Sequence, residues 1–185
     1  MVVTEGANEE ADREFIASIA NHPTFTFLQA LFKGNFKPYY EKHGKDTNVY
    51  WTHVRKCFLK TRSGENLKKH GEKALKVCAY KAEYLKREIE ALKPKLIVTV
   101  GKEAIEALLK YSSDERLQGN LRELIFDKGG IFNEVKIGKV TTNIVVVPHP
   151  SGRSKLWTEL AEKHPNAKKI LEELSSKIIE NLVTR

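Results

Sequence analysis

The sequence predicts an α/β fold in which helices are layered on a mostly parallel sheet. Short apolar runs of strand character alternate with longer segments of helical periodicity along the 185 residues. One run, KLIVTV at residues 95–100, stops at Gly101, which is typical of a buried parallel strand. A second run, IVVV at residues 144–147, stops at Pro148. No repeat or linker interrupts the pattern, so we expect a single domain over residues 1–185.

The N-terminal part is expected to hold two strands and two helices. Residues 1–4 read as a short strand. Residues 8–21 read as a helix, because Asn8 can cap it and acidic residues favour its positive end. Residues 22–33 are apolar and aromatic, and the His-Pro pair at their start suits the opening of a helix. Residues 47–55, TNVYWTHVR, are rich in β-forming residues and predict a second strand.

The rest of the chain continues this alternation. Apolar residues recur at helical spacing up to Leu92, where the Lys93-Pro94 pair ends the helix. Two segments of strand character on either side of Gly138 predict a hairpin. In chain order, the expected elements are a helix at 72–92, a strand at 95–100, a helix at 102–110, hairpin arms at 132–137 and 139–147, a helix from Lys155 and a helix at 167–183.

Composition narrows the class of protein. With 41% hydrophobic and 30% charged residues, the chain is typical of a globular protein rather than a disordered one. No apolar run approaches the length of a membrane span, and the N-terminus lacks the features of a secretory signal. We therefore expect a cytoplasmic protein with no membrane partner. Abundant Lys, Glu and Ile with a single Met resemble thermophile usage.

The charge balance points to a polyanion. The 32 basic and 24 acidic residues leave a formal net charge of +8 and a pI near 9.4. Such a surplus favours a partner such as nucleic acid. A basic surface that is merely solvated would have the same balance.

Ligands of open α/β sheets lie beyond the carboxyl ends of the strands. The segments that follow the expected strands are 5–8, 52–57, 101–103 and 149–157. The last belongs to PHPSGRSKLW, in which His149 stands between two prolines that restrict the backbone. A histidine so placed can donate a hydrogen bond to an oxygen on which negative charge develops. A turn in which His149 only caps the strand end is the alternative.

The same loop carries groups suited to phosphate. After Pro150 come a hydroxyl, a backbone amide and two basic side chains, the groups that commonly contact a nucleic-acid backbone. These residues are Ser151, Gly152, Arg153 and Lys155.

Four stretches between Val2 and Trp157 resemble the uracil-DNA glycosylase superfamily. VVVPHPSGRS resembles its second signature, His-Pro-Ser followed by a loop that enters DNA. NVYWTHVRKC and ALKPKLIVTVGKEAIEALL resemble the second and third strands of its iron–sulfur branch (family 4), with the segments that follow them. VVTEGANEEAD resembles the first signature. The resemblance implies a three-layer α/β/α fold with a mostly parallel central sheet. It also implies a DNA glycosylase that hydrolyses the N-glycosidic bond of uracil or another deaminated base in base excision repair.

The resemblance further implies which residues are catalytic. His149 matches the histidine that donates to the uracil oxygen and stabilises the leaving anion. Glu5 matches an acid of the first signature, which orients or activates water or stabilises the cationic sugar. The partner is then DNA containing uracil or a deaminated base, with the Ser151 to Lys155 turn as its contact.

The base pocket is expected to include a histidine and an aromatic ring. His53 stands where the family usually has the asparagine that reads the uracil edge. Phe15 is nearest in sequence to the family's stacking phenylalanine, although Phe25 or Tyr39 could serve instead.

Cys57 and Cys78 match the third and fourth cluster ligands of the iron–sulfur branch. A four-iron cluster held by cysteines needs four thiolates, and the sequence has two cysteines. We therefore expect no cofactor and no metal, the thiols being relics, a close pair or core residues. The basic segment 56–70 could follow a DNA backbone. His70 at its end has a faint resemblance to the reactive histidine of a branch that traps DNA covalently.

Two classes of function remain open. The intact His149-Pro150-Ser151 motif and Glu5 favour the enzyme. The departures in the first signature and at His53 favour a DNA- or nucleotide-binding module of the same fold. A Rossmann-like enzyme of other chemistry is disfavoured, because no Gly-x-Gly-x-x-Gly or Gly-Lys-Ser/Thr loop occurs.

Overall fold

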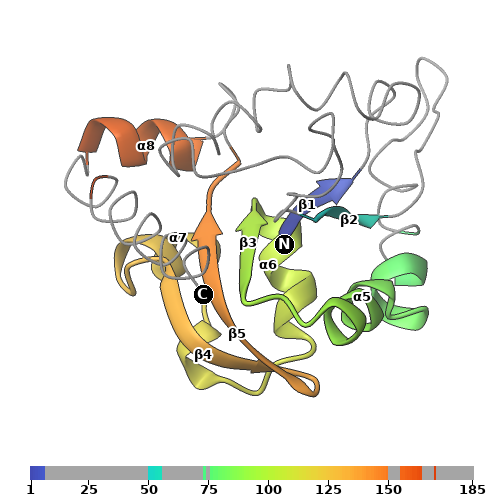
Figure 1. Ribbon diagram of the computed structural model, residues 1–185. Helices are drawn as coiled ribbons and strands as arrows, with labels where there is room; N and C mark the ends of the chain where they lie inside the picture. Colours follow the sequence, from blue (N-terminus) through green and yellow to red (C-terminus); the bar gives the residue numbers. More distant parts are fainter. Residues whose placement is uncertain (7–49, 56–72, 74–75, 150–154, 164–168, 170–185) are drawn as a thin grey trace, which may run out of the picture.

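The computed structural model describes residues 1–6, 50–55, 73, 76–149, 155–163 and 169 (Figure 1). Five strands of this part form one sheet in the order β2-β1-β3-β5-β4. The strands are β1 (Val2–Gly6), β2 (Trp51–Arg55), β3 (Leu96–Val100), β4 (Ile131–Ile137) and β5 (Val140–Val147). The first four in this order run parallel, and β4 pairs with β5 in the antiparallel sense. The mostly parallel sheet is therefore confirmed.

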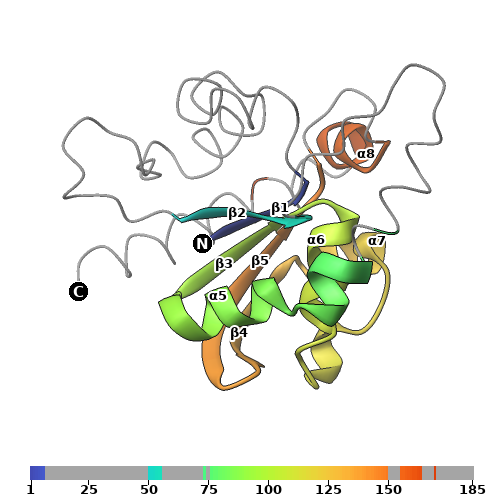
Figure 2. The ribbon, with the colours of Figure 1, turned by 90° about the vertical axis from the view of Figure 1, so that its right-hand side faces the viewer.

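The helices of the described part include two that cover one face of the sheet. In chain order they are the π-helical segment η1 (Lys76–Lys81), α5 (Tyr84–Leu92), α6 (Lys102–Leu109), the 3-10 helix η2 (Glu115–Leu117), α7 (Leu121–Phe126) and α8 (Lys155–Lys163). α6 packs on β1, β2 and β3, and α5 packs beside α6 on β2 (Figure 2). Among the helices of these residues, none has the length and apolar character needed to cross a membrane.

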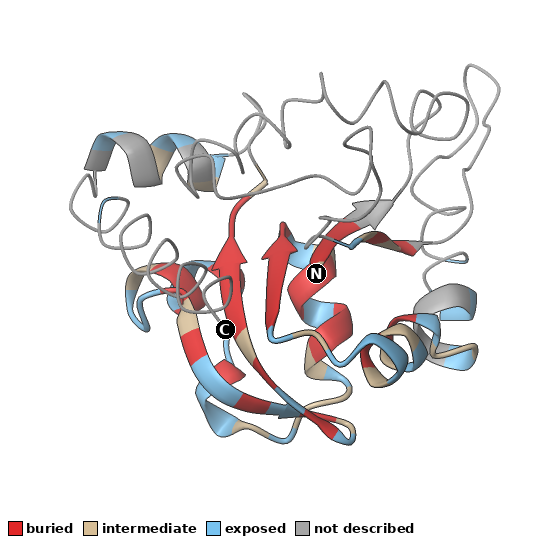
Figure 3. Ribbon diagram, in the orientation of Figure 1, coloured by how far each residue is buried: buried red, intermediate tan, exposed pale blue. Residues whose placement is uncertain are grey.

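The central strand β3 is buried on both sides. All five of its residues are at most 7% exposed (Figure 3). Because successive strand residues point to opposite faces, both faces of the sheet are covered at this strand. The last four residues of β5, Ile144 to Val147, are each 0% exposed as well. This burial fits the three-layer α/β/α arrangement, and it explains why both strands read as continuous apolar runs.

The hairpin predicted about Gly138 is confirmed. Ile137 of β4 pairs with Val140 of β5, and Gly138 in the turn has φ of +57°. Glycine adopts this left-handed conformation without the steric cost that a Cβ would add. The hairpin therefore places β4 at the edge of the sheet and leads β5 back into its centre.

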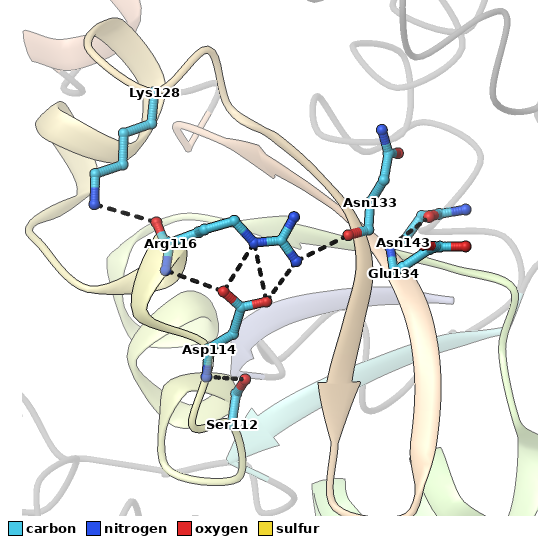
Figure 4. Close-up of polar contacts among 7 residues, drawn as sticks. All are labelled: Ser112, Asp114, Arg116, Lys128, Asn133, Glu134 and Asn143. Carbon is cyan, nitrogen blue, oxygen red and sulfur yellow. Dashed lines mark hydrogen bonds and ion pairs between the residues drawn. The ribbon is translucent and has the colours of Figure 1, made fainter.

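A polar network joins η2 to β4 (Figure 4). Asp114 accepts from the backbone and side chain of Arg116, whose guanidinium also donates to Asn133 O at 3.0 Å. Lys128 donates to Arg116 O at 3.2 Å and to Gln118 O at 2.7 Å. The Arg116 guanidinium lowers the pKa of Asp114 mainly by hydrogen bonding. These contacts hold the loop after α6 against the edge strand.

The prediction of one continuous helix at 72–92 is wrong. The π-helical segment η1 ends at Lys81, and Glu83 adopts a left-handed conformation with φ of +49° before α5 begins. The restart allows Leu85 and Ile89 of α5 to be fully buried. Leu92, which the apolar rhythm assigned to the same stripe, is 48% exposed because the helix ends there.

Other boundaries also differ from the prediction. β1 continues to Gly6, beyond the strand expected at 1–4, and β2 begins at Trp51 within the range expected at 47–55. The sequence analysis missed α7, although its start carries a capping box: Asn120 accepts from the Glu123 amide, and Glu123 accepts from the Asn120 amide. The helices expected at 102–110 and from Lys155 are confirmed as α6 and α8. Those at 8–21 and 22–33, and all but residue 169 of that at 167–183, lie outside the described residues.

The amino group of Met1 is buried at the start of β1 and donates to Leu96 O at 2.8 Å. Burial lowers its pKa from 8.0 to about 5. Between these values the unfolded chain binds a proton that the folded chain does not, so stability rises with pH. For a chain that begins at Met1, the free energy of unfolding is therefore expected to fall by up to about 4 kcal/mol as pH falls from 8 to 5.

Urea unfolding at several pH values measures this loss. The control is a chain with one residue added before Met1, whose amide can donate to Leu96 O without carrying a charge. The added residue should flatten the pH profile between 5 and 8. Identical profiles for the two chains would show that the buried amino group is not the cause.

Candidate active site

The carboxyl ends of the four parallel strands lie in a row along one edge of the sheet, which is not the edge formed by the outer strand β4. Gly6 of β1 lies beside Arg55 of β2, and Val100 of β3 lies beside Val147 of β5. Since β1 and β3 are also paired, the four ends follow one another in the order β2, β1, β3, β5. The four segments expected to approach a ligand thus all leave the sheet at this edge.

His149 lies two residues beyond the end of β5. The Gly101 amide donates to Val147 O at 2.9 Å, which continues the pairing of β3 and β5 to the last residue of β5. The next residue, Pro148, is buried and has no amide hydrogen with which to extend the ladder. The half-buried His149 is therefore placed at the edge by a rigid central strand.

Glu5 lies in β1, one residue before the end of that strand. Only β3 stands between β1 and β5, so the backbones of β1 and β5 are about 10 Å apart. The topology brings the strands that carry Glu5 and His149 to the same edge of the sheet. The Glu5 side chain is not among the described parts, and the approach of its carboxylate to His149 stays a prediction.

His53 of β2 lies directly beside Thr4 of β1 in the parallel register. The Thr4 Oγ1 and His53 Nδ1 atoms are 2.5 Å apart, and the Thr4 hydroxyl also reaches Thr52 O at 3.4 Å. Thr4 is 8% exposed and the Nε2 atom of His53 is buried. A parallel pair of strands therefore holds one ring nitrogen of His53 against a buried hydroxyl.

The neighbouring residue of β2 faces the other way. Thr52 Oγ1 donates to Glu88 Oε2 of α5 at 2.8 Å, and the Tyr50 hydroxyl donates to Glu88 Oε1 at 3.4 Å. These bonds attach β2 to α5. Because side chains alternate along a strand, His53 points to the sheet face opposite α5.

A half-buried carboxyl at this edge was not singled out by the sequence analysis. Glu103 lies in the first turn of α6, directly after β3, and its Oε2 atom is buried. The turn begins at Gly101, whose φ of +89° suits glycine. A carboxylate is favoured near a helix N-terminus. The only sequence signal was the position of 101–103 after an apolar strand.

α8 begins with Lys155, an exposed residue proposed from the sequence to contact DNA. Leu156 packs against the hydrophobic core, and Glu159 forms an ion pair with Arg122 of α7. The hydrogen bond to Glu159 raises the pKa of Arg122 above its already high value. α8, which begins six residues after His149, is therefore attached to the body of the domain.

Several predicted residues fall outside the described part of the chain. They are Phe15, Phe25, Tyr39, Cys57, His70, Ser151, Gly152 and Arg153. Cys78 lies in η1, where only its backbone is described. Within the described residues, no group of three His, Cys, Asp or Glu side chains is arranged to hold a metal.

Comparison with known proteins assigns the family. No curated protein matches the chain significantly. A family profile matches residues 15–175, which include β2, β3, β5, α8 and His149. The profile is that of the uracil DNA glycosylase superfamily, and the chain belongs to this superfamily.

Proposed function

We propose that the protein is a DNA glycosylase that hydrolyses the N-glycosidic bond of uracil, or of another deaminated base, in base excision repair. Membership of the superfamily supports glycosylase chemistry. The observation that carries the proposal is the shared sheet edge, at which β1 with Glu5 ends two strands away from β5, with His149 just beyond it. With β3 between them, the ends of these two strands are about 10 Å apart.

The chemistry begins with extrusion of the base, because the stacked duplex hides the glycosidic bond. As the bond breaks, the sugar gains oxocarbenium character and the departing base takes negative charge. His149 donates a hydrogen bond to a base oxygen and stabilises that charge. Glu5 orients or activates the attacking water, or stabilises the cationic sugar.

DNA contacts follow from the same edge. Lys155 and the segment before it, with Ser151, Gly152 and Arg153, bind phosphates and enter the groove. The net charge of +8 supports attraction to the DNA backbone. Phe15 stacks on the extruded base.

The base edge is read by His53. When the Thr4 hydroxyl donates to Thr52 O, its oxygen accepts from Nδ1–H of the ring, and Nε2 becomes an acceptor. An acceptor at this place takes the N3–H of uracil or the N1–H of hypoxanthine, provided that binding of the base uncovers the buried Nε2 atom. Cytosine offers no hydrogen at its ring N3, so the same acceptor discriminates against it.

Replacing Thr4 with valine tests this reading. The variant removes the hydroxyl from His53, and we expect kcat/KM for uracil to fall about fivefold, the value of one buried hydrogen bond. The preference for uracil over cytosine should fall with it. Thr142→Val is the matched control, because Thr142 is a buried β5 threonine toward the opposite end of the sheet, bonded to Asn143 O at 3.3 Å. Equal effects of the two substitutions on selectivity would contradict the role of Thr4.

The chain resembles the iron–sulfur branch, family 4, in β2 and β3 and in the segments that follow them, and Cys57 and Cys78 match two of the four cluster ligands of that branch. Four thiolates are needed, and residues 1–185 contain Cys57 and Cys78 alone. No step of the proposed reaction involves a cluster.

The experiment is a base-release assay. Labelled oligonucleotides with one uracil, hypoxanthine or xanthine are incubated with the pure protein, and abasic sites are then cleaved with alkali. We expect cleavage at the uracil position and none in a matched strand with cytosine there. Salt-sensitive binding with no release of any of the three bases would show that the protein is a DNA-binding module of the same fold and not a glycosylase.

A further inference from the structure

We propose that Arg122 is a positioning residue for DNA binding, because it fixes α8, the helix that begins with Lys155. The inference rests on the proposed function, in which Lys155 contacts DNA. Arg122 itself lies on α7 and was assigned no role by the sequence.

The contact joins two helices that are separate in sequence. The Arg122 guanidinium pairs with the Glu159 carboxylate of α8, and it also lies 4.9 Å from the centre of the Phe126 ring. The ring restricts the guanidinium from one side while the carboxylate holds it from another. The pair is only half-exposed on the arginine side, at 51%, and 22% exposed at Glu159. It is therefore better shielded from salt than a fully solvated pair.

The helix α7, which carries Arg122, is anchored to the core. α7 begins with the reciprocal cap between Asn120 and Glu123, and it buries Leu121, Leu124 and Ile125. Arg122 stands between these core residues on a short helix that packs on β5. α7 can therefore act as a fixed point against which α8 is held.

On α8 the contact lies about one helical turn from Lys155. Leu156 packs on the core, and Glu159 three residues later lies on the same side of the helix. Lys155 precedes Leu156, and five residues separate it from His149. A shift of α8 would therefore move the exposed Lys155 relative to His149 and to a phosphate bound beside it.

Two substitutions of opposite charge test the proposal. Arg122→Ala and Glu159→Gln each break the pair, and each is expected to raise KM for the uracil oligonucleotide and Kd for DNA about two- to fivefold. The chemical step is untouched, so kcat should stay near the wild-type value. If only the net charge mattered, the two substitutions would change DNA affinity in opposite directions, because the loss of Glu159 makes the protein more positive and should tighten DNA binding.

Arg116→Ala is the matched control. It removes the same charge from another half-exposed arginine, which is paired with Asp114 and contacts β4 rather than α8 (Figure 4). This variant should leave KM and Kd nearly unchanged. The double variant Arg122→Glu with Glu159→Arg restores an ion pair between the two helices without changing the net charge, and it should recover most of the lost affinity.

The outcomes separate the two proposals. Tighter or unchanged DNA binding by Glu159→Gln, or an equal loss in Arg116→Ala and Arg122→Ala, would overturn the positioning role while the glycosylase stands. A wild-type protein that binds DNA but releases no base overturns the glycosylase, and the Kd values still decide the role of Arg122. A wild-type protein that does not bind the oligonucleotide overturns both.

Discussion

Replacing His149 with alanine is expected to lower the single-turnover rate of base release about 100- to 1,000-fold, the loss typical of one missing oxyanion donor. In the proposed reaction the departing base takes negative charge. β5 and the buried Pro148 place His149 at the edge of the sheet, where it can donate to that charge. Without the imidazole, that charge has no positioned donor. The rate is measured with enzyme in excess over a labelled uracil oligonucleotide, so that DNA affinity does not enter.

His149→Gln is the companion variant, because its amide retains a hydrogen-bond donor and should recover part of the rate. The half-buried position of His149 suggests that neither change unfolds the domain, and thermal unfolding of both variants checks this. A rate within about threefold of wild type in His149→Ala would exclude the imidazole from charge stabilisation.

Replacing Glu5 with glutamine is expected to lower the same rate about 100- to 10,000-fold if the carboxylate accepts a proton from water. The amide keeps the size of the side chain but cannot act as a base. Both roles of Glu5 need an ionised carboxylate, so the variant should be slower than wild type throughout the pH range in which wild type is active. Single-turnover rates of the two proteins over that range measure the loss.

Two other carboxylates on α6 serve as comparisons. Glu106 is exposed and pairs with Lys102 at 3.5 Å, so Glu106→Gln should leave the rate unchanged. Glu103 is the carboxyl at the centre of the edge, with one oxygen buried. A large loss in Glu103→Gln together with an active Glu5→Gln would move the catalytic acid from β1 to α6.

Local signals predicted most of the described elements. The apolar run before Gly101, the stop at Lys93-Pro94 and the turn at Gly138 each act over a few residues, and the structure confirms all three. The break at Glu83 was missed because the apolar rhythm continues through it. A single left-handed residue is evident in the structure, but it leaves no periodic pattern in the sequence.

The candidate site was predictable to a different degree. The motif around His149 identified the superfamily that the family profile confirms for residues 15–175. The partner of His53 could not be predicted, because Thr4 reaches it through the register of two parallel strands 49 residues apart. Glu103 was overlooked, since its burial depends on what packs around the start of α6.

By itself the sequence determined the α/β class and the strands that end beside Gly101 and Pro148, because apolar periodicity and turn residues act between near neighbours. The tertiary structure alone decided the strand order β2-β1-β3-β5-β4, the contact of Thr4 with His53 and the pairing of Arg122 with Glu159. These depend on which surfaces bury one another, a choice made by packing across the whole domain. The edge where β1 and β5 end is a product of that packing.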